Sequence, residues 1–265
     1  MAKQAQRLFF GFEAEAPWPA DLPAGRVLEE SCRHMTLAFL GNVEGQKVNT
    51  LLPTFPKPSF QYGLLGYADR LTFLPKQHPR VVAWHVACSQ LVEEYQKKLI
   101  DWLQKQGFKF RERESFLPHI TIARAPFSFQ VWRKSFKPFP IVLKAIHLYE
   151  SLGNLNYVSR WSYPLIPPFE ELEHTADVAF CIRGATLSDL CMHAQAALSF
   201  LFPPIHLFFP PLSVIYSLEE IIRHLNAGIT RADGELGCPF KAVSLHGEIR
   251  ESKNHFLEWE MIVDV

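Results

Sequence analysis

Two tetrapeptides in the first half of the chain repeat one pattern of residue types. His34-Met35-Thr36-Leu37 and His119-Ile120-Thr121-Ile122 each read histidine, apolar, threonine, aliphatic. Because side chains alternate along a β-strand, the histidine and the threonine of each copy share one face. Two such strands that face each other across a sheet would bring two imidazoles and two hydroxyls to one cleft.

The chemistry that suits such a cleft is general acid–base attack on a phosphoester. A neutral imidazole takes a proton from the nucleophile, and a protonated imidazole gives one to the leaving oxygen. Histidine is the side chain whose ordinary pKa allows both states near neutrality. The threonine hydroxyls would hydrogen-bond non-bridging oxygens, where charge builds in the transition state. A single copy is typical of an ordinary strand with a polar face, but two matched copies favour a site.

The surrounding segments have the alternation of strands and one clear helical pattern. Strands are expected at residues 7–12, 34–40, 64–73, 81–88 and 141–150, and residues 157–165 close this half of the chain. Gly41-Asn42 is expected to close the first motif strand as a turn. Ser89 is expected to cap a helix that Gly107 ends. The apolar face of this helix is expected to consist of Leu91, Tyr95, Leu99, Trp102 and Leu103.

Composition indicates a globular protein with an uneven charge distribution. The 265 residues are 48% hydrophobic and 20% charged, and the formal net charge is zero. Residues 1–165 carry 21 Lys and Arg against 13 Asp and Glu, a net +8, whereas residues 166–265 carry 6 against 14, a net −8. The proline-rich connector Pro164–Pro168 lies at the change of sign. We therefore expect two domains, residues 1–165 and 166–265, although chance segregation of surface charge is the simpler alternative.

Nothing in the sequence indicates secretion or a membrane. The five cysteines are scattered and have no CxxC or zinc-like spacing, which favours reduced thiols and a cytoplasmic protein. The N-terminus lacks the apolar stretch of a signal peptide, and no apolar run has the length of a transmembrane helix.

A basic segment with Lys109, Arg111 and Arg113 precedes the second motif strand.

Residues 7–165 resemble the two-histidine phosphoesterase superfamily, and most closely its RNA 2′,3′-cyclic phosphodiesterases, also named 2′-5′ RNA ligases. The resemblance rests on the runs Arg7–Phe10, His34–Gly41, Pro118–Arg124 and Leu148–Ser151. It implies two related α/β lobes around a cleft, with hydrolysis of a 2′,3′-cyclic phosphate at an RNA end and no cofactor. Reverse 2′-5′ ligation would use the same site.

The resemblance also implies roles for individual residues. His34 and His119 match the catalytic pair, and Thr36 and Thr121 match the threonines that contact the phosphate. Arg124 lies where the family often has an arginine near the phosphate, although a solvated charge at a strand end is the plainer interpretation. The sequence does not decide which histidine is the acid, which ribose oxygen leaves or which RNA is the substrate.

The second half resembles archease, the small protein that activates the 3′-5′ RNA-splicing ligase, in a shortened form. The resemblance rests on the runs 171–177, 184–187, 240–246 and 263–265. Thr186 with Asp189, and Ser217 with Glu220, are expected to form capping boxes at the starts of two helices.

By this resemblance, Asp177, Asp264 and the terminal carboxylate of Val265 would bind a divalent metal. Oxygen-only ligands suit Ca²⁺, Mg²⁺ or Mn²⁺. His174 is expected to be a packed or hydrogen-bonded residue and not a ligand, because hard oxygen sites rarely use imidazole. A turn carboxylate at Asp177 and a frayed end at Asp264 are the structural alternatives.

We therefore expect an α+β protein in which a two-lobed phosphoesterase precedes a smaller archease-like α/β domain. Its expected function is metal-independent hydrolysis of 2′,3′-cyclic phosphate RNA ends, coupled to RNA ligation, tRNA splicing or repair through an RNA ligase partner. The competing hypothesis is a non-catalytic adaptor that binds RNA ends and delivers them to a ligase. Turnover of a short RNA that ends in a cyclic phosphate discriminates the two.

Overall fold

The computed structural model describes residues 5–110, 116–174, 177–212, 214–245, 247–253 and 256–265. The chain divides into two compact units, residues 1–137 with 141–166, and residues 138–140 with 167–265. The expected domain boundary between residues 165 and 166 predicts that each half folds on its own, and this stays a prediction. Arg111 and Arg113, and residues 175, 176 and 246 of the runs given above, lie outside the described residues.

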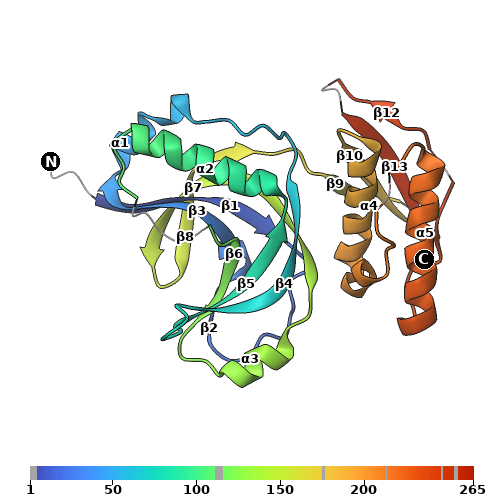
Figure 1. The fold of residues 1–265 in the computed structure, drawn as a ribbon, viewed down its shortest axis with the longest axis horizontal. Coiled ribbons are helices and arrows are strands. Elements are labelled where there is room, and N and C mark those ends of the chain that lie inside the picture. The colour runs from blue at the N-terminus through green and yellow to red at the C-terminus, as the bar shows by residue number, and fades with distance from the viewer. Residues whose placement is uncertain (1–4, 111–115, 175–176, 213, 246, 254–255) are drawn as a thin grey trace. The chain divides into compact units, whose positions relative to one another are not determined.

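A closed antiparallel sheet forms the first unit (Figure 1). Its strands are β1 (Ala5–Glu15), β2 (Arg26–Val27), β3 (His34–Glu44), β4 (Leu64–Leu74), β5 (Val81–Cys88), β6 (His119–Arg124), β7 (Phe139–Gly153) and β8 (Asn156–Pro164). The order is β1-β3-β6-β5-β4-β7-β8, and a further pairing of β1 with β7 closes the sheet. The two motif strands, β3 and β6, are therefore direct neighbours in the sheet although they lie far apart in the sequence.

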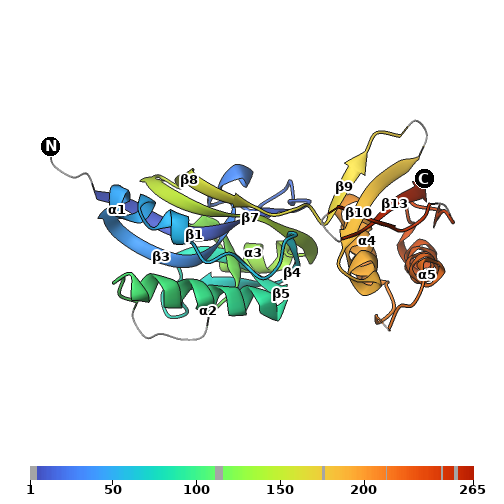
Figure 2. The same cartoon turned by 90° about the horizontal axis from the view of Figure 1, so that it is seen from above.

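Helix α2 (Gln90–Lys105) lies along one face of this sheet (Figure 2). The Ser89 hydroxyl accepts a hydrogen bond from the backbone N–H of Leu91, and Gly107 follows the helix with φ of 86°, both as expected. The buried side chains of the helix are Val92, Tyr95, Leu99 and Leu103. Leu91 is exposed, so its predicted place on the apolar face is wrong, because Val92 completes the i, i+3, i+7 spacing instead. The other helical segments of this unit are α1 (Gly45–Asn49), α3 (Phe129–Ser135), η1 (Glu30–Cys32) and η2 (Leu52–Thr54).

Strand β3 continues through Gly41 and Asn42, so the expected turn at these residues is wrong. Leu8 pairs with Gly41 and Phe9 pairs with Phe39, which leaves an extra residue in the ladder. Gly41 has φ of 78°. An extra residue makes a β-bulge, and glycine adopts positive φ without steric cost. The glycine therefore bends the strand and does not end it.

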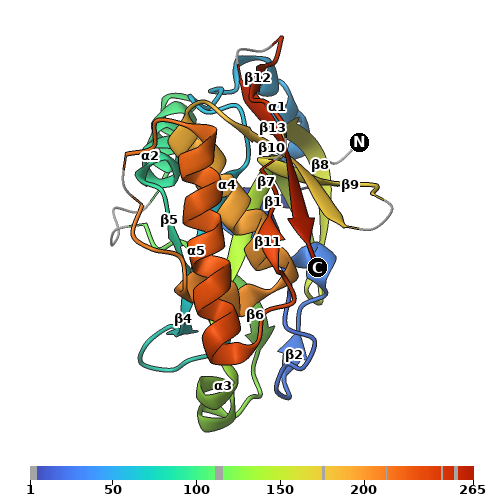
Figure 3. The ribbon, with the colours of Figure 1, turned by 90° about the vertical axis from the view of Figure 1, so that its right-hand side faces the viewer.

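The second unit is a sheet covered by two helices on one face (Figure 3). Its strands are β9 (Phe169–Leu172), β10 (Val178–Gly184), β11 (Ala242–Val243), β12 (Arg250–Glu251) and β13 (Leu257–Asp264), and its helical segments are α4 (Leu187–Leu201), η3 (Pro203–Leu207) and α5 (Leu218–Leu236). The core lies between helices and sheet, with Trp259, Met261 and Val263 of β13 facing α4 and α5. The alternate residues of β13 face away from that core.

Of the two capping boxes predicted in this unit, the structure has one in full and the other in part. Thr186 and Asp189 form the complete capping box at α4. At α5 the Ser217 hydroxyl accepts from the N–H of Glu220, as predicted, but the Glu220 carboxylate accepts from the N–H of Tyr216. The reciprocal half of the second box is therefore shifted by one residue. All five cysteines are free thiols, as expected, and none of the described helices is long and apolar enough to span a membrane.

Candidate active site

The pairing of β3 with β6 brings the four motif side chains together on one face. Met35 pairs with Ile120, and both side chains are fully buried in the core. Because neighbours alternate along a strand, the histidine and threonine of each motif lie on the opposite face. Extending the antiparallel register by one residue each way sets His34 across from Thr121, and His119 across from Thr36. The four residues that the sequence predicted thus form one cluster.

Both motif histidines are held in the same way by the backbone. His34 Nδ1 donates to the carbonyl oxygen of Cys32 (2.7 Å), and His119 Nδ1 donates to that of Leu117 (2.8 Å). A carbonyl oxygen only accepts, so the proton resides on Nδ1 of each ring. Each Nε2 is then the nitrogen that can exchange a proton with a substrate. It accepts a proton when the ring is neutral and donates one when the ring is protonated.

Three aromatic rings surround the His34 imidazole. Its ring centroid lies 4.7 Å from that of Phe9, 5.2 Å from that of Tyr149 and 4.8 Å from that of Tyr157. Only 9% of His34 is exposed, whereas His119 is half-buried. Burial lowers the pKa of His34 to about 4, opposed by the Cys32 carbonyl and assisted by the positive charges of His119 and Arg124. His34 is therefore a neutral imidazole at neutral pH.

Arg124 is the exposed last residue of β6. It pairs with Arg26 of β2 on one side and with Val81 of β5 on the other. Its charge reaches His34, since it contributes to the lowered pKa of that imidazole. Arg124 thus ends the strand that begins with His119, and its positive charge acts on His34.

Two carboxylate–imidazole pairs flank the motif histidines, and sequence reasoning missed both. His85 of β5 lies directly across from His119, and its Nδ1 donates to Asp69 Oδ1 (2.6 Å). On the other side, Glu13 of β1 lies directly across from His34. Glu13 pairs with His147 of β7, which is distant in sequence, whereas Asp69 and His85 lie on the consecutive strands β4 and β5. No local spacing signals either pair, and only the register of the strands reveals them.

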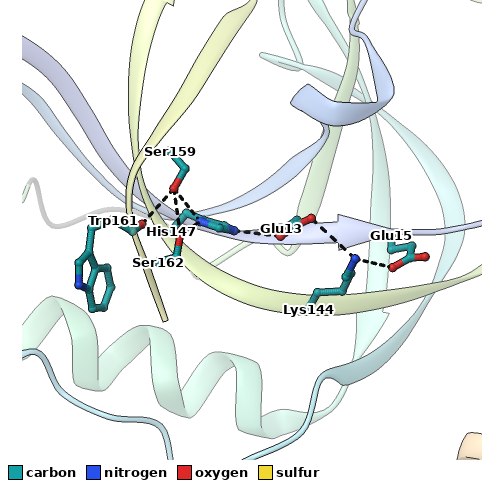
Figure 4. A network of polar contacts seen from close by, with 7 residues as sticks. All are labelled: Glu13, Glu15, Lys144, His147, Ser159, Trp161 and Ser162. Atoms are coloured by element: carbon teal, nitrogen blue, oxygen red, sulfur yellow. Dashed lines mark hydrogen bonds and ion pairs between the residues drawn. The ribbon is translucent and has the colours of Figure 1, made fainter. Parts of the chain in front are cut away.

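Glu13 belongs to a network that joins β1, β7 and β8 (Figure 4). His147 Nε2 donates to Glu13 Oε2 (3.0 Å), because a carboxylate only accepts, and this hydrogen bond holds the pKa of the Glu13 carboxyl below its ordinary value. His147 Nδ1 then accepts from Ser162 Oγ (2.7 Å), while Ser159 Oγ donates to a backbone carbonyl (3.1 Å). Lys144 completes the network with an ion pair to Glu15 (2.8 Å) and a longer one to Glu13 (3.9 Å).

The predicted metal ligands of the second unit are only partly brought together. Val178 pairs with Val263, so the register extended by one residue sets Asp177 across from Asp264 on the face away from the core. Asp264 Oδ1 accepts from the Ser244 hydroxyl (3.0 Å), and the carbonyl oxygen of Val265 accepts from Lys241 Nζ (2.6 Å). The two aspartates are oxygen donors that fit a hard cation, but a lysine ammonium occupies the side where Val265 would bind. Within the described part of the chain, no three His, Cys, Asp or Glu side chains form a group that could hold a metal.

Comparison with known proteins relates part of the chain to a phosphodiesterase. No protein-family model matches the chain. Over 134 residues, the chain is 29% identical to the RNA 2′,3′-cyclic phosphodiesterase of Thermotoga maritima. This match covers 47% of this chain and 69% of that protein. This part of the chain is homologous to that protein.

Solved structures are similar over a larger share of the chain. A phosphoesterase structure is 23% identical and covers 62% of this chain and 99% of its own, with a TM-score of 0.44. E. coli LigT complexed with 3′-AMP is 22% identical; the match covers 61% of this chain and 99% of that chain, with a TM-score of 0.43. TT0787 of Thermus thermophilus is 16% identical; the match covers 60% of this chain and 98% of that chain, with a TM-score of 0.47.

Proposed function

We propose that the first unit is an RNA phosphodiesterase that opens a 2′,3′-cyclic phosphate at an RNA end. The observation that carries this proposal is the pairing of two His-x-Thr strands, which sets two Nδ1-anchored imidazoles and two hydroxyls on one face. The homology of this part of the chain to a protein named RNA 2′,3′-cyclic phosphodiesterase supports the same reaction.

In the proposed mechanism, His34 is the base and His119 is the acid. The lowered pKa keeps His34 neutral, so its Nε2 accepts a proton from water as the water oxygen forms a bond to phosphorus. The bond from phosphorus to one ribose oxygen breaks, and that oxygen takes a proton from Nε2 of the His119 imidazolium. The product is a terminal phosphomonoester, and exchange of protons with solvent restores both rings.

The remaining predicted residues bind the phosphate in this mechanism. Thr36 and Thr121 donate hydrogen bonds to its non-bridging oxygens, and Arg124 supplies positive charge. No metal takes part in a step, because the two imidazoles carry out both proton transfers. A bound phosphate anion also favours the charged form of His34, so substrate binding strengthens the base.

The test is turnover of a short RNA that ends in a 2′,3′-cyclic phosphate. His34→Ala and His119→Ala are each expected to lose ~10²–10⁴-fold in turnover and to keep RNA binding. His78→Ala, which removes an exposed histidine from the β4–β5 loop, is the matched control. Wild-type protein that binds this RNA without turnover would instead support the non-catalytic adaptor.

For the second unit we propose an archease-like role in RNA ligation, tRNA splicing or repair, with an RNA ligase as partner. Its motif residues support this, together with the register that sets Asp177 across from Asp264. These two carboxylates would hold Ca²⁺, Mg²⁺ or Mn²⁺ through oxygen, and the metal would neutralise their joined charge.

A further inference from the structure

Two long stretches of the first unit contain no acidic residue. Neither residues 70–92 nor residues 115–149 include an aspartate or a glutamate. Their basic residues are Arg70, Lys76, Arg80, Arg124, Arg133, Lys134, Lys137 and Lys144. Stretches with a single sign of charge attract a polyanion, and the attraction weakens with salt.

Three phenylalanine rings meet at the surface where these stretches come together. Phe73 lies near the end of β4, and Phe127 and Phe129 follow β6. The ring centroids are 6.0 Å apart for Phe73 and Phe127, 5.0 Å for Phe73 and Phe129, and 5.2 Å for Phe127 and Phe129. Phe129 is 40% exposed, and the other two are half-buried. The Arg133 guanidinium lies over the Phe73 ring at 5.6 Å.

Three more arginines lie around the same end of β6. Arg26 pairs with Arg124, and the carbonyl of Arg80 accepts from the N–H of Ala125 (2.9 Å). Gly25, which precedes Arg26, lies beside Phe127, since a Cβ on it would be in ordinary van der Waals contact with that side chain at 3.7 Å. The three arginines and Arg133 are exposed, and among the described residues none of the four forms an ion pair. We call these four arginines and the three phenylalanines the basic–aromatic surface.

We propose that the basic–aromatic surface binds the single-stranded RNA that precedes the cyclic phosphate. Surfaces for single-stranded nucleic acid combine positive charge along the backbone with aromatic rings on which bases stack. Arg124 belongs both to this surface and to the candidate active site, ~10 Å along β6 from Thr121. An RNA whose end lies at the motif histidines therefore meets the arginines first and the phenylalanines after them.

This inference rests on the proposed function and specifies its substrate. A cyclic mononucleotide fills the motif cluster and leaves the phenylalanines uncovered, whereas an oligonucleotide reaches them. Four exposed guanidinium groups without carboxylate partners give this surface one sign of charge, which suits a polyanion better than an apolar protein partner. The structure therefore favours an oligonucleotide over a free cyclic nucleotide.

The experiment compares a cyclic mononucleotide with an octanucleotide that ends in a 2′,3′-cyclic phosphate. Phe129→Ala is expected to lower the ratio of kcat/KM for the octanucleotide to that for the mononucleotide by about tenfold, because base–aromatic stacking contributes on that scale. Arg133→Gln is expected to lower the same ratio and to flatten its dependence on salt. Leu152→Ala and Lys97→Gln, which change exposed residues at the β7–β8 turn and on α2, are the matched controls.

The outcomes separate this inference from the proposed function. An unchanged ratio in both surface variants, with a thermal melt like that of wild type, overturns the inference. If wild-type protein turns over neither substrate, the proposed function fails and the surface is tested by binding alone. Fluorescence anisotropy with the labelled octanucleotide must then show weaker binding to Phe129→Ala and Arg133→Gln than to the controls, and equal binding refutes the inference.

Discussion

Removing one ring from around His34 should raise the pKa of that imidazole. The pKa is about 4 against an ordinary value of 6.5, and each pKa unit corresponds to about 1.4 kcal/mol, so burial disfavours the charged ring by about 3 kcal/mol. The rings of Phe9, Tyr149 and Tyr157 together exclude water from His34, and of these three residues Tyr157 is half-buried. An equal share for Tyr157 is about 1 kcal/mol. Tyr157→Ala should therefore raise the pKa of His34 to about 5.

The pKa can be measured from the imidazole carbon shifts in an NMR pH titration, with His34→Gln to assign the signal. Tyr157→Phe keeps the ring and is the matched control, so the pKa of His34 should stay near 4 in that variant. In the proposed mechanism His34 is the base of the free enzyme, so the acid limb of kcat/KM should move with its pKa.

Two results would refute this reasoning. A wild-type His34 that titrates near its ordinary pKa would show that water reaches the ring in spite of the aromatic neighbours. An unchanged pKa in Tyr157→Ala would show that the aromatic surroundings do not cause the shift.

Three further predictions concern stability, independence and metal. Because the pKa of His34 is lower in the folded state, the unfolded state binds more protons below pH 6.5. The wild type should therefore lose up to about 3 kcal/mol of unfolding free energy as the pH falls from 6.5 to 4. Urea titrations of His34→Gln should lack this loss. Residues 1–165 expressed alone should fold and hydrolyse the cyclic phosphate with and without EDTA, and an insoluble fragment or a loss on chelation would contradict the expected boundary or the metal-free mechanism. Calorimetry should show Ca²⁺ or Mn²⁺ binding that Asp177→Asn weakens at least about tenfold, and equal binding by that variant would exclude the site.

Local periodicity sufficed for the motif faces but not for what surrounds them. Alternation along a strand predicted that His34 and Thr36 share a face, and the burial of Met35 agrees with it. Alternation cannot tell which strand lies beside which, so it did not reveal that His85 lies across from His119. Gly41 shows the same limit, since a glycine suits both a turn and a β-bulge, and only the pairing with β1 shows that it forms a bulge.

The matching backbone anchors of the two motif histidines have a consequence for how a substrate is oriented. Each Nδ1 is tied to the carbonyl two residues before it, so the two halves of the site offer the same nitrogen from opposite sides. A cyclic phosphate carries two ribose oxygens and could enter such a pseudo-symmetric site in either of two orientations. The aromatic surroundings of His34 break the equivalence, because burial disfavours the charged form of that ring and so makes it a poor proton donor. In the proposed mechanism the leaving oxygen must therefore face His119, and a substrate bound the other way round would be held without reacting.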